Sequence, residues 1–175
     1  MPGSIPREAV EEFLRPLRRV VSSVTPGVVN VRGGYHPSEK PHSAIIGDGQ
    51  PVRLAGPGQL SLRMVHHYRV VKDSGERGPR KINTAAYYYA LEDRNGREII
   101  PYHWHPESRS PIRFPHLHVG PAGCAREELA MAHCPTGRIS IEEFVRFAIA
   151  DFRVEPLRTD WSDVLAEAGR NFGSR

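Results

Sequence analysis

The sequence predicts an α+β fold, in which an antiparallel β-meander of about four strands carries an N-terminal helix and C-terminal helices packed on one face. Three observations predict this class. Apolar residues recur at helical spacing near the N-terminus, alternate with polar residues over the middle of the chain, and return to helical spacing near the C-terminus. A helix, then strands, then helices is the order typical of an α+β domain.

The first segment, residues 1–24, is predicted to hold an amphipathic helix from Pro6 to Val24. Ser4 is a candidate cap, Pro6 suits the first turn, and Pro16 is expected to kink the helix because proline removes a hydrogen bond. The apolar stripe consists of Val10, Phe13, Leu14, Leu17, Val20, Val21 and Val24. We expect this stripe to belong to the core, and a docking surface for a partner is the alternative.

The next segment is rich in glycine and proline. A short strand is expected from Val28 to Val31, and residues 32–58 are predicted to form a long irregular loop because Gly, Pro, Ser and His are concentrated there. Structureless loops of this length are uncommon in compact domains and tend to be functional or mobile.

The antiparallel sheet is predicted over residues 60–120. Asn95-Gly96 lies between two strand patterns, which is the strongest short-range signal for a hairpin. The four predicted strands are Leu60–Lys72, Lys81–Asp93, Glu98–His105 and Arg113–Gly120. Between Arg63 and Lys81, basic residues outnumber acidic ones, so this region is a candidate for contact with a phosphate backbone or an ordinary solvated hairpin.

The C-terminal part, residues 125–173, is predicted to be helical. A short helix is expected from Ala125 to Ala132. Ser140 and Glu143 have the spacing of a capping box, which predicts a helix that continues to about Arg153. A last helix is expected from Val164 to Arg170.

Composition limits the function further. The 175 residues are expected to form a single domain, residues 1–175, and the formal net charge of +4 permits an anionic partner without requiring one. Two cysteines are too few for a disulfide scaffold. Because the chain shows neither a signal peptide nor a long apolar run, we expect a soluble cytoplasmic protein with no membrane partner.

Four of the nine histidines lie in two His-x-His pairs, His103/His105 and His116/His118. Residues i and i+2 of a strand point to the same face, so each pair shares a face. The Pro- and Ser-rich residues 106–115 are expected to return the chain antiparallel, which would place both pairs and Arg113 on one patch of sheet.

Three interpretations of this patch remain open. The first is metal-independent cleavage of RNA. Histidine suits both proton transfers, and arginine offers a bidentate contact to phosphate. His116 and His118 are then the candidate base and acid in unresolved order, Arg113 is the phosphate clamp, and His103, His105 and Tyr102 complete the candidate catalytic set. This interpretation needs no cofactor.

The second interpretation is a site for Zn or another divalent metal. Its ligands would be His103, His105, His116 and His118, because His-x-His pairs on neighbouring strands are a suitable geometry. Further candidate ligands are Glu107, Cys124, His133 and Cys134. The third interpretation is a binding or structural surface, in which these histidines are satisfied polar groups beside Trp104 and Phe114.

A family resemblance favours the first interpretation. Tyrosine-bearing strands precede a turn and the strand Arg97-Glu98-Ile99-Ile100, a segment from Tyr102 to His105 follows, and then come Pro115-His116-Leu117-His118 and the acidic-apolar helix that starts at Ser140. From Tyr68 to Arg153 the chain resembles the TumE-like toxins of bacterial toxin–antitoxin operons. The resemblance implies growth inhibition through RNA and neutralisation by a cognate antitoxin. Only His116 and His118 match the family's motif.

The sequence therefore predicts a toxin-like protein of a toxin–antitoxin or defence operon that acts as a metal-independent endoribonuclease. Its expected partners are RNA and a cognate antitoxin or another protein. Two alternatives stand beside it: a non-enzymatic binding protein of a bacterial defence complex that docks through the N-terminal stripe, and a histidine-rich metal-binding protein.

Overall fold

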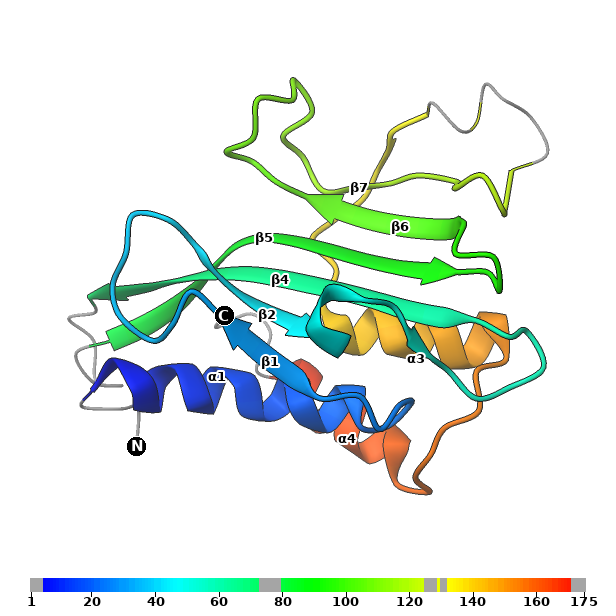
Figure 1. Ribbon diagram of the computed structural model, residues 1–175, viewed down its shortest axis with the longest axis horizontal. Helices are drawn as coiled ribbons and strands as arrows, with labels where there is room; N and C mark the ends of the chain where they lie inside the picture. The colour runs from blue at the N-terminus through cyan, green and yellow to red at the C-terminus, as the bar shows by residue number, and fades with distance from the viewer. Residues whose placement is uncertain (1–4, 73–79, 125–128, 130–131, 171–175) are drawn as a thin grey trace.

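A computed structural model describes residues 5–72, 80–124, 129 and 132–170 of the chain (Figure 1). The helices are α1 (Pro6–Val21), α3 (Ile141–Phe152) and α4 (Trp161–Arg170), with a 3-10 turn at Gly47–Gly49. The strands are β1 (Val29–Arg32), β2 (His42–Ile46), β3 (Val52–Arg53), β4 (Ser61–Lys72), β5 (Arg80–Glu92), β6 (Glu98–Trp104), β7 (His116–Leu117) and β8 (Cys134–Pro135).

The predicted α+β class is confirmed, and the sheet is larger than predicted. Its eight strands pair antiparallel in the order β1-β2-β4-β5-β6-β7-β8, with β3 also paired to β4. The four predicted strands correspond to β4, β5, β6 and β7. β7 is only two residues long, against the eight predicted, and Pro115 directly before it lacks the backbone N–H that a ladder needs.

The helices cover one face of this sheet (Figure 1). Along β4 the side chains alternate, with Leu62, Met64, His66, Tyr68 and Val70 buried and their neighbours half-buried. Phe13 of α1 packs against His66 and Tyr68, and Phe144 of α3 packs against Tyr89 of β5. The opposite face of β4, β5 and β6 carries no helix among the described residues, so its side chains are available for chemistry.

The apolar stripe of α1 belongs to the core. Val10, Leu14, Leu17, Val20 and Val21 are each 0% exposed. The alternative in which this stripe serves as a docking surface is therefore wrong for the folded chain, because α3, α4 and the sheet already cover it. α1 ends at Val21 rather than Val24, where backbone turns replace the helical hydrogen-bond pattern.

The start of α1 also differs in detail from the prediction. Ser4, the candidate cap, lies outside the described residues, and Ile5 occupies the N-cap position without a side-chain cap. Pro6 lies in the first turn as predicted, and the helix runs without interruption through Pro16.

The prediction of an irregular loop over residues 32–58 is wrong for its central part, which contains β2, the 3-10 turn and β3. β2 pairs with β1 on one side and with β4 on the other. Ala44, Ile45 and Ile46 are at most 4% exposed there. Three apolar residues between Gly- and Pro-rich flanks give a weak local signal, and their burial between two other strands is what stabilises the strand.

The C-terminal helices agree closely with prediction. Ser140 caps α3 in a complete capping box, as predicted, since its hydroxyl accepts from the Glu143 amide at 3.1 Å and its own amide donates to the Glu143 carboxylate at 2.7 Å. α4 begins at Trp161, three residues before the predicted Val164. The predicted helix Ala125–Ala132 lies mostly outside the described residues. Among the described residues, no helix combines the length and the apolar character that crossing a membrane requires.

Candidate metal centre on the open face of the sheet

The register between β6 and β7 brings the two His-x-His pairs together. His103 lies directly opposite His116, and Tyr102 lies opposite Leu117. Cross-strand partners share a face, so His103 and His116 both point away from the helices. The expectation that the chain returns antiparallel and sets the pairs side by side is confirmed.

Backbone contacts beyond β7 place His118 in the same patch. The amide of His118 donates to the carbonyl of Pro101 at 3.0 Å, and the amide of Gly120 donates to the carbonyl of Ile99 at 2.8 Å. A Cβ on Gly120 would lie 2.2 Å from the carbonyl oxygen of Glu98, so only glycine permits this approach. Gly120 thus keeps the chain against β6 and His118 beside His103.

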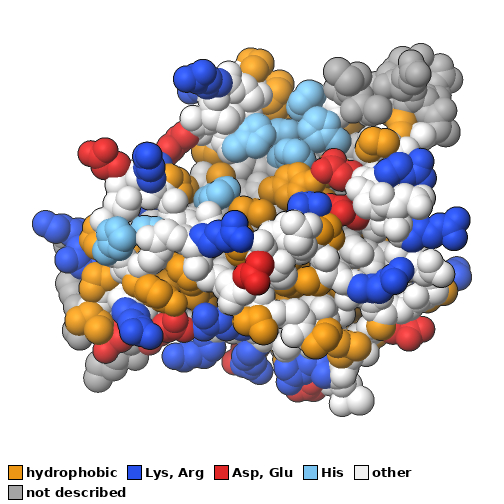
Figure 2. All heavy atoms as spheres, viewed as in Figure 1, with side chains coloured by type: hydrophobic (Ala, Val, Ile, Leu, Met, Phe, Trp, Pro, Cys, Tyr) orange, Lys and Arg blue, Asp and Glu red, His pale blue; other side chains and the backbone are white. Residues whose placement is uncertain are grey.

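Five histidines form the cluster that results, which we call the histidine cluster: His103, His105, His116, His118 and His133. The ring centroids of His103 and His118 are 5.0 Å apart, those of His116 and His118 are 5.0 Å apart, and those of His118 and His133 are 4.3 Å apart. His105 lies 5.9 Å from His103 and 5.6 Å from His116 by the same measure. Figure 2 shows histidine side chains gathered on one part of the surface.

Three of these histidines are close enough together to hold a metal ion. One ring nitrogen from each of His103, His116 and His118 lies within 4.8 Å of the other two. Nδ1 of His116 is 2.8 Å from the carbonyl oxygen of Phe114. This nitrogen must donate to the carbonyl, so Nε2 of His116 is left with its lone pair free, as in many metal-bound histidines.

His103 supplies a second, independent indication. Its Nε2 is buried and has no hydrogen-bond partner among the described residues. Burying a polar nitrogen without a partner costs free energy, so such an atom in a folded protein calls for an explanation. A metal ion bound between the three rings would provide the missing partner.

Burial also favours the uncharged imidazole in this cluster. Desolvation, reinforced by the neighbouring histidines, lowers the pKa of His103 to about 4. Desolvation likewise lowers the pKa of His116, against the opposing effect of the Phe114 carbonyl, and the pKa of His118, against the opposing charge of Glu98. Imidazoles with a lowered pKa are neutral at pH 7, and the neutral form is the one that binds metals.

Of the two other predicted residues, Tyr102 points away from the histidine cluster. Tyr102 lies on the helix-covered face, where its ring packs edge-on against Phe144 and Phe147, so the face alternation of β6 directs it away from the histidines. Arg113 is exposed in the loop after β6, and its side chain forms no hydrogen bond or ion pair with another described residue.

The further candidate ligands also fall into two groups. Glu107 accepts two hydrogen bonds of 2.6 and 2.5 Å from Arg69 and does not belong to the group of three histidines. His133 lies in the cluster and is exposed. Cys124 and Cys134 are both half-buried, and Cys134 lies on β8 opposite Leu117, whose side chain points to the face of the sheet opposite His116.

Two neighbours of the cluster were not among the predicted site residues. Tyr88 of β5 pairs with His103, and their rings meet edge-on at 4.8 Å. The hydroxyl of Tyr88 donates a short hydrogen bond to Glu98. The sequence did contain a signal for Tyr88. In a strand, alternation places Tyr88 on the face opposite Tyr87 and Tyr89, which is the open face that carries the histidines.

Basic residues of the sheet are partly neutralised. Arg63 donates to Glu92 at 2.6 Å, and Arg69 binds Glu107 as described above. Two of the cations that suggested a phosphate-binding surface are therefore paired with carboxylates, which weakens the attraction of this region for a phosphate backbone.

Comparisons of the chain with family models, with curated proteins and with solved structures gave no significant match. The resemblance to TumE-like toxins accordingly stays a prediction, and the site itself carries the functional argument.

Proposed function

We propose that this chain binds one divalent transition-metal ion of the zinc type through His103, His116 and His118 and uses it to activate water for hydrolysis. The observation that carries the proposal is the set of three ring nitrogens within 4.8 Å of one another. Nitrogens bound at about 2.1 Å to a tetrahedral ion lie about 3.4 Å apart. Movements of about 1 Å in the side chains would therefore complete the site on an unchanged sheet.

Three protein ligands with a fourth position for water are the pattern of catalytic rather than structural zinc. An ion held by His103, His116 and His118 would lower the pKa of a bound water to about 7 and so would supply a nucleophile at neutral pH. His105 and His133 border the proposed position without belonging to the three-nitrogen set. They are placed to contact a substrate or a leaving group rather than to close the coordination sphere.

Metal binding is the first test. The purified chain is stripped with EDTA and titrated with zinc against a chromophoric chelator, and we expect one equivalent to bind. Changing a residue that orients a ligand typically weakens metal binding 10- to 100-fold, so His103→Ala and His118→Ala should each weaken it by about 100-fold or more. His36→Ala, a change at an exposed histidine outside the cluster, is the matched control. Wild-type protein that binds no zinc, or equal losses in all three variants, would refute the proposal.

A second candidate is the metal-independent ribonuclease predicted from the sequence, acting as a toxin that a cognate antitoxin neutralises. The observation in its favour is that the imidazoles of His116 and His118 lie 5.0 Å apart on the open face, where one could act as base and the other as acid. RNA cleavage in EDTA separates the two candidates. Cleavage that leaves 2′,3′-cyclic phosphate ends, and that the double variant His116→Ala/His118→Ala loses, would favour the metal-independent mechanism; cleavage only after zinc is added would favour the metal centre.

A further inference from the structure

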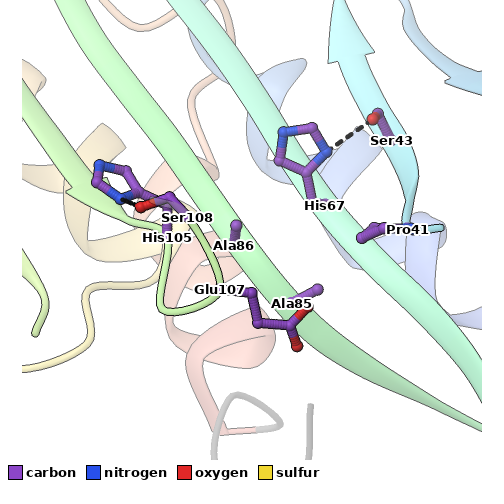
Figure 3. A pocket seen from close by; sticks show the side chains of 8 residues that line it. All are labelled: Pro41, Ser43, His67, Ala85, Ala86, His105, Glu107 and Ser108. Carbon is purple, nitrogen blue, oxygen red and sulfur yellow. Dashed lines mark hydrogen bonds between the residues drawn. The ribbon is translucent and has the colours of Figure 1, made fainter. Parts of the chain in front are cut away.

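A cavity of about 250 Å³ opens on the same face of the sheet, next to the histidine cluster. Figure 3 shows its walls: Ala85 and Ala86 of β5 form the floor, His67 of β4 and His105 stand on either side, and Ser43 and Ser108 lie at the edges. The floor is therefore short and apolar, while the two walls are aromatic rings.

The strand register explains why the two rings stand on either side of a gap. His67 lies opposite Ala86, and His105 follows Trp104, whose partner is Tyr87, the residue after Ala86. Neighbouring strands are about 4.8 Å apart, so the two histidines stand about 9.6 Å apart with an alanine between them. A larger residue at position 86 would fill this gap.

Hydrogen bonds hold both rings in place. The hydroxyl of Ser43 lies 2.8 Å from Nδ1 of His67, and the hydroxyl of Ser108 lies 3.0 Å from Nδ1 of His105. Each imidazole is thus fixed from the edge of the cavity, so the two walls are ordered before any ligand enters.

The size and the walls of the cavity select a small planar ring. Pockets for drug-sized ligands hold roughly 300–1,000 Å³, so this cavity is suited to a single compact group. Aromatic rings stack with centroids about 4.5–7 Å apart, so a ring halfway between His67 and His105 can stack on both. We propose that the cavity binds an unpaired nucleobase of a nucleotide substrate whose phosphate reaches the metal at His103, His116 and His118.

The mouth of the cavity carries a polar group suited to a base. The carboxylate of Glu107 lines it and is oriented by two hydrogen bonds from Arg69. Each carboxylate oxygen keeps a free lone pair, and nucleobases present N–H groups at their edges. Apolar rings such as a phenylalanine side chain lack these donors, so Glu107 favours a base over them.

His105 links the cavity to the metal site. Its ring lines the cavity and lies 5.6 Å from the ring of His116. A sugar separates the base from the phosphate of a nucleotide by a comparable length, so one nucleotide can occupy both places. The link to the metal rests on the proposed function, whereas recognition of the base rests on the cavity alone.

The test measures the binding of three probes to the full chain by calorimetry and ligand-detected NMR. The probes are cytidine, cytidine 5′-monophosphate and ribose 5-phosphate. We expect cytidine to bind metal-free protein, the monophosphate to bind zinc-loaded protein more tightly, and ribose 5-phosphate to bind it at least about tenfold more weakly than the monophosphate, because stacking of a base contributes substantially to affinity. Ala86→Leu should weaken binding of cytidine and its monophosphate about tenfold or more without changing the zinc affinity. His67→Ala, which removes a wall rather than filling the cavity, should also weaken the binding of cytidine and its monophosphate.

The matched control is Val71→Leu, which enlarges a half-buried side chain of β4 on the same face as His67 but outside the cavity. This change should leave the binding of cytidine and its monophosphate unchanged. Equal affinities for the monophosphate and ribose 5-phosphate, or unchanged cytidine binding in both Ala86→Leu and His67→Ala, would overturn the inference. Failure of zinc to bind would refute the proposed metal centre. The binding of cytidine to metal-free protein would still test whether the cavity holds a nucleobase. A short single-stranded oligocytidylate that binds more tightly than the monophosphate would identify RNA as the source of the base, and equal binding would identify a free nucleotide.

Discussion

At the scale of single residues, the surroundings decide what each histidine does. His66 is buried on the helix-covered face, where its two nitrogens meet the Tyr89 hydroxyl at 2.6 Å and the Thr84 hydroxyl at 3.1 Å. Its polar atoms are satisfied, so it is a core residue. His103 is also largely buried, yet its Nε2 has no partner among the described residues and faces other imidazoles. The same residue type is structural in one place and a candidate ligand in the other.

The lowered pKa of His103 predicts how the stability of the metal-free protein depends on pH. Between pH 6.5 and about 4, a histidine in the unfolded chain binds a proton that folded His103 does not bind. Protons therefore favour the unfolded chain, and the free energy of unfolding falls as the pH is lowered through this range. Urea midpoints measured in EDTA from pH 8 to pH 4 give the dependence.

A variant separates this effect from the protonation of carboxylates. His103→Gln should make the pH dependence shallower than in the wild type, because it removes the group whose pKa differs between the folded and unfolded chain. A His103→Gln variant with the wild-type slope would show that His103 does not titrate differently in the folded and unfolded states.

At the scale of elements, local capping and cross-strand pairing stabilise different parts of the chain. α3 is defined at its start by Ser140 and Glu143, whose two hydrogen bonds satisfy amides that the helix cannot. β7 has no such local device. Its two residues are held by β6 on one side and β8 on the other, and the histidine cluster depends on that pairing.

Ser140→Ala should lower the free energy of unfolding by about 1 kcal/mol, because it removes the side-chain acceptor for the Glu143 amide at a position only 2% exposed. Chemical denaturation measures the loss. Ser162→Ala is the matched control, since Ser162 is an exposed residue in the first turn of α4 that makes no capping contact. Equal effects of the two changes would contradict the role of the capping box.

At the scale of the whole molecule, the three described helices and the sheet share one core on one side of the sheet. Leu14 and Leu17 of α1, Phe144 of α3 and Leu165 of α4 are each at most 1% exposed and belong to this core. One face of the sheet is thereby devoted to stability, and the other is left for the histidine cluster and the cavity. Substitutions in the core should therefore lower the free energy of unfolding, whereas substitutions in the site should change ligand binding.

Leu14→Ala should cost about 2–5 kcal/mol of unfolding free energy, because Leu14 is fully buried and the change leaves a cavity in the core. Arg15→Ala, on the exposed side of the same helix, should change it by no more than about 0.5 kcal/mol. Both are measured by urea denaturation. If Leu14→Ala were as stable as Arg15→Ala, α1 would be a peripheral element, and the docking interpretation of its stripe would return.

Elements with strong local patterns were predictable from the sequence. The periodicities of α1, β4 and β5, the Asn95-Gly96 turn and the Ser140 capping box all depend on residues close together in the chain. The approach of His103 to His116 was predictable for a related reason, since each His-x-His pair fixes its own face and a loop of about ten residues can only return the chain nearby.

Features that join distant segments were decided by the tertiary structure alone. β2 forms because β1 and β4 supply its hydrogen-bond partners, and Tyr102 leaves the site because the helices cover its face of β6. The gap between His67 and His105 exists because β5 sets an alanine between them. The sequence by itself thus determined the α+β class and the histidine pairs, through local spacing. Only tertiary pairing, which no local pattern encodes, decided which three imidazoles meet and what cavity lies beside them.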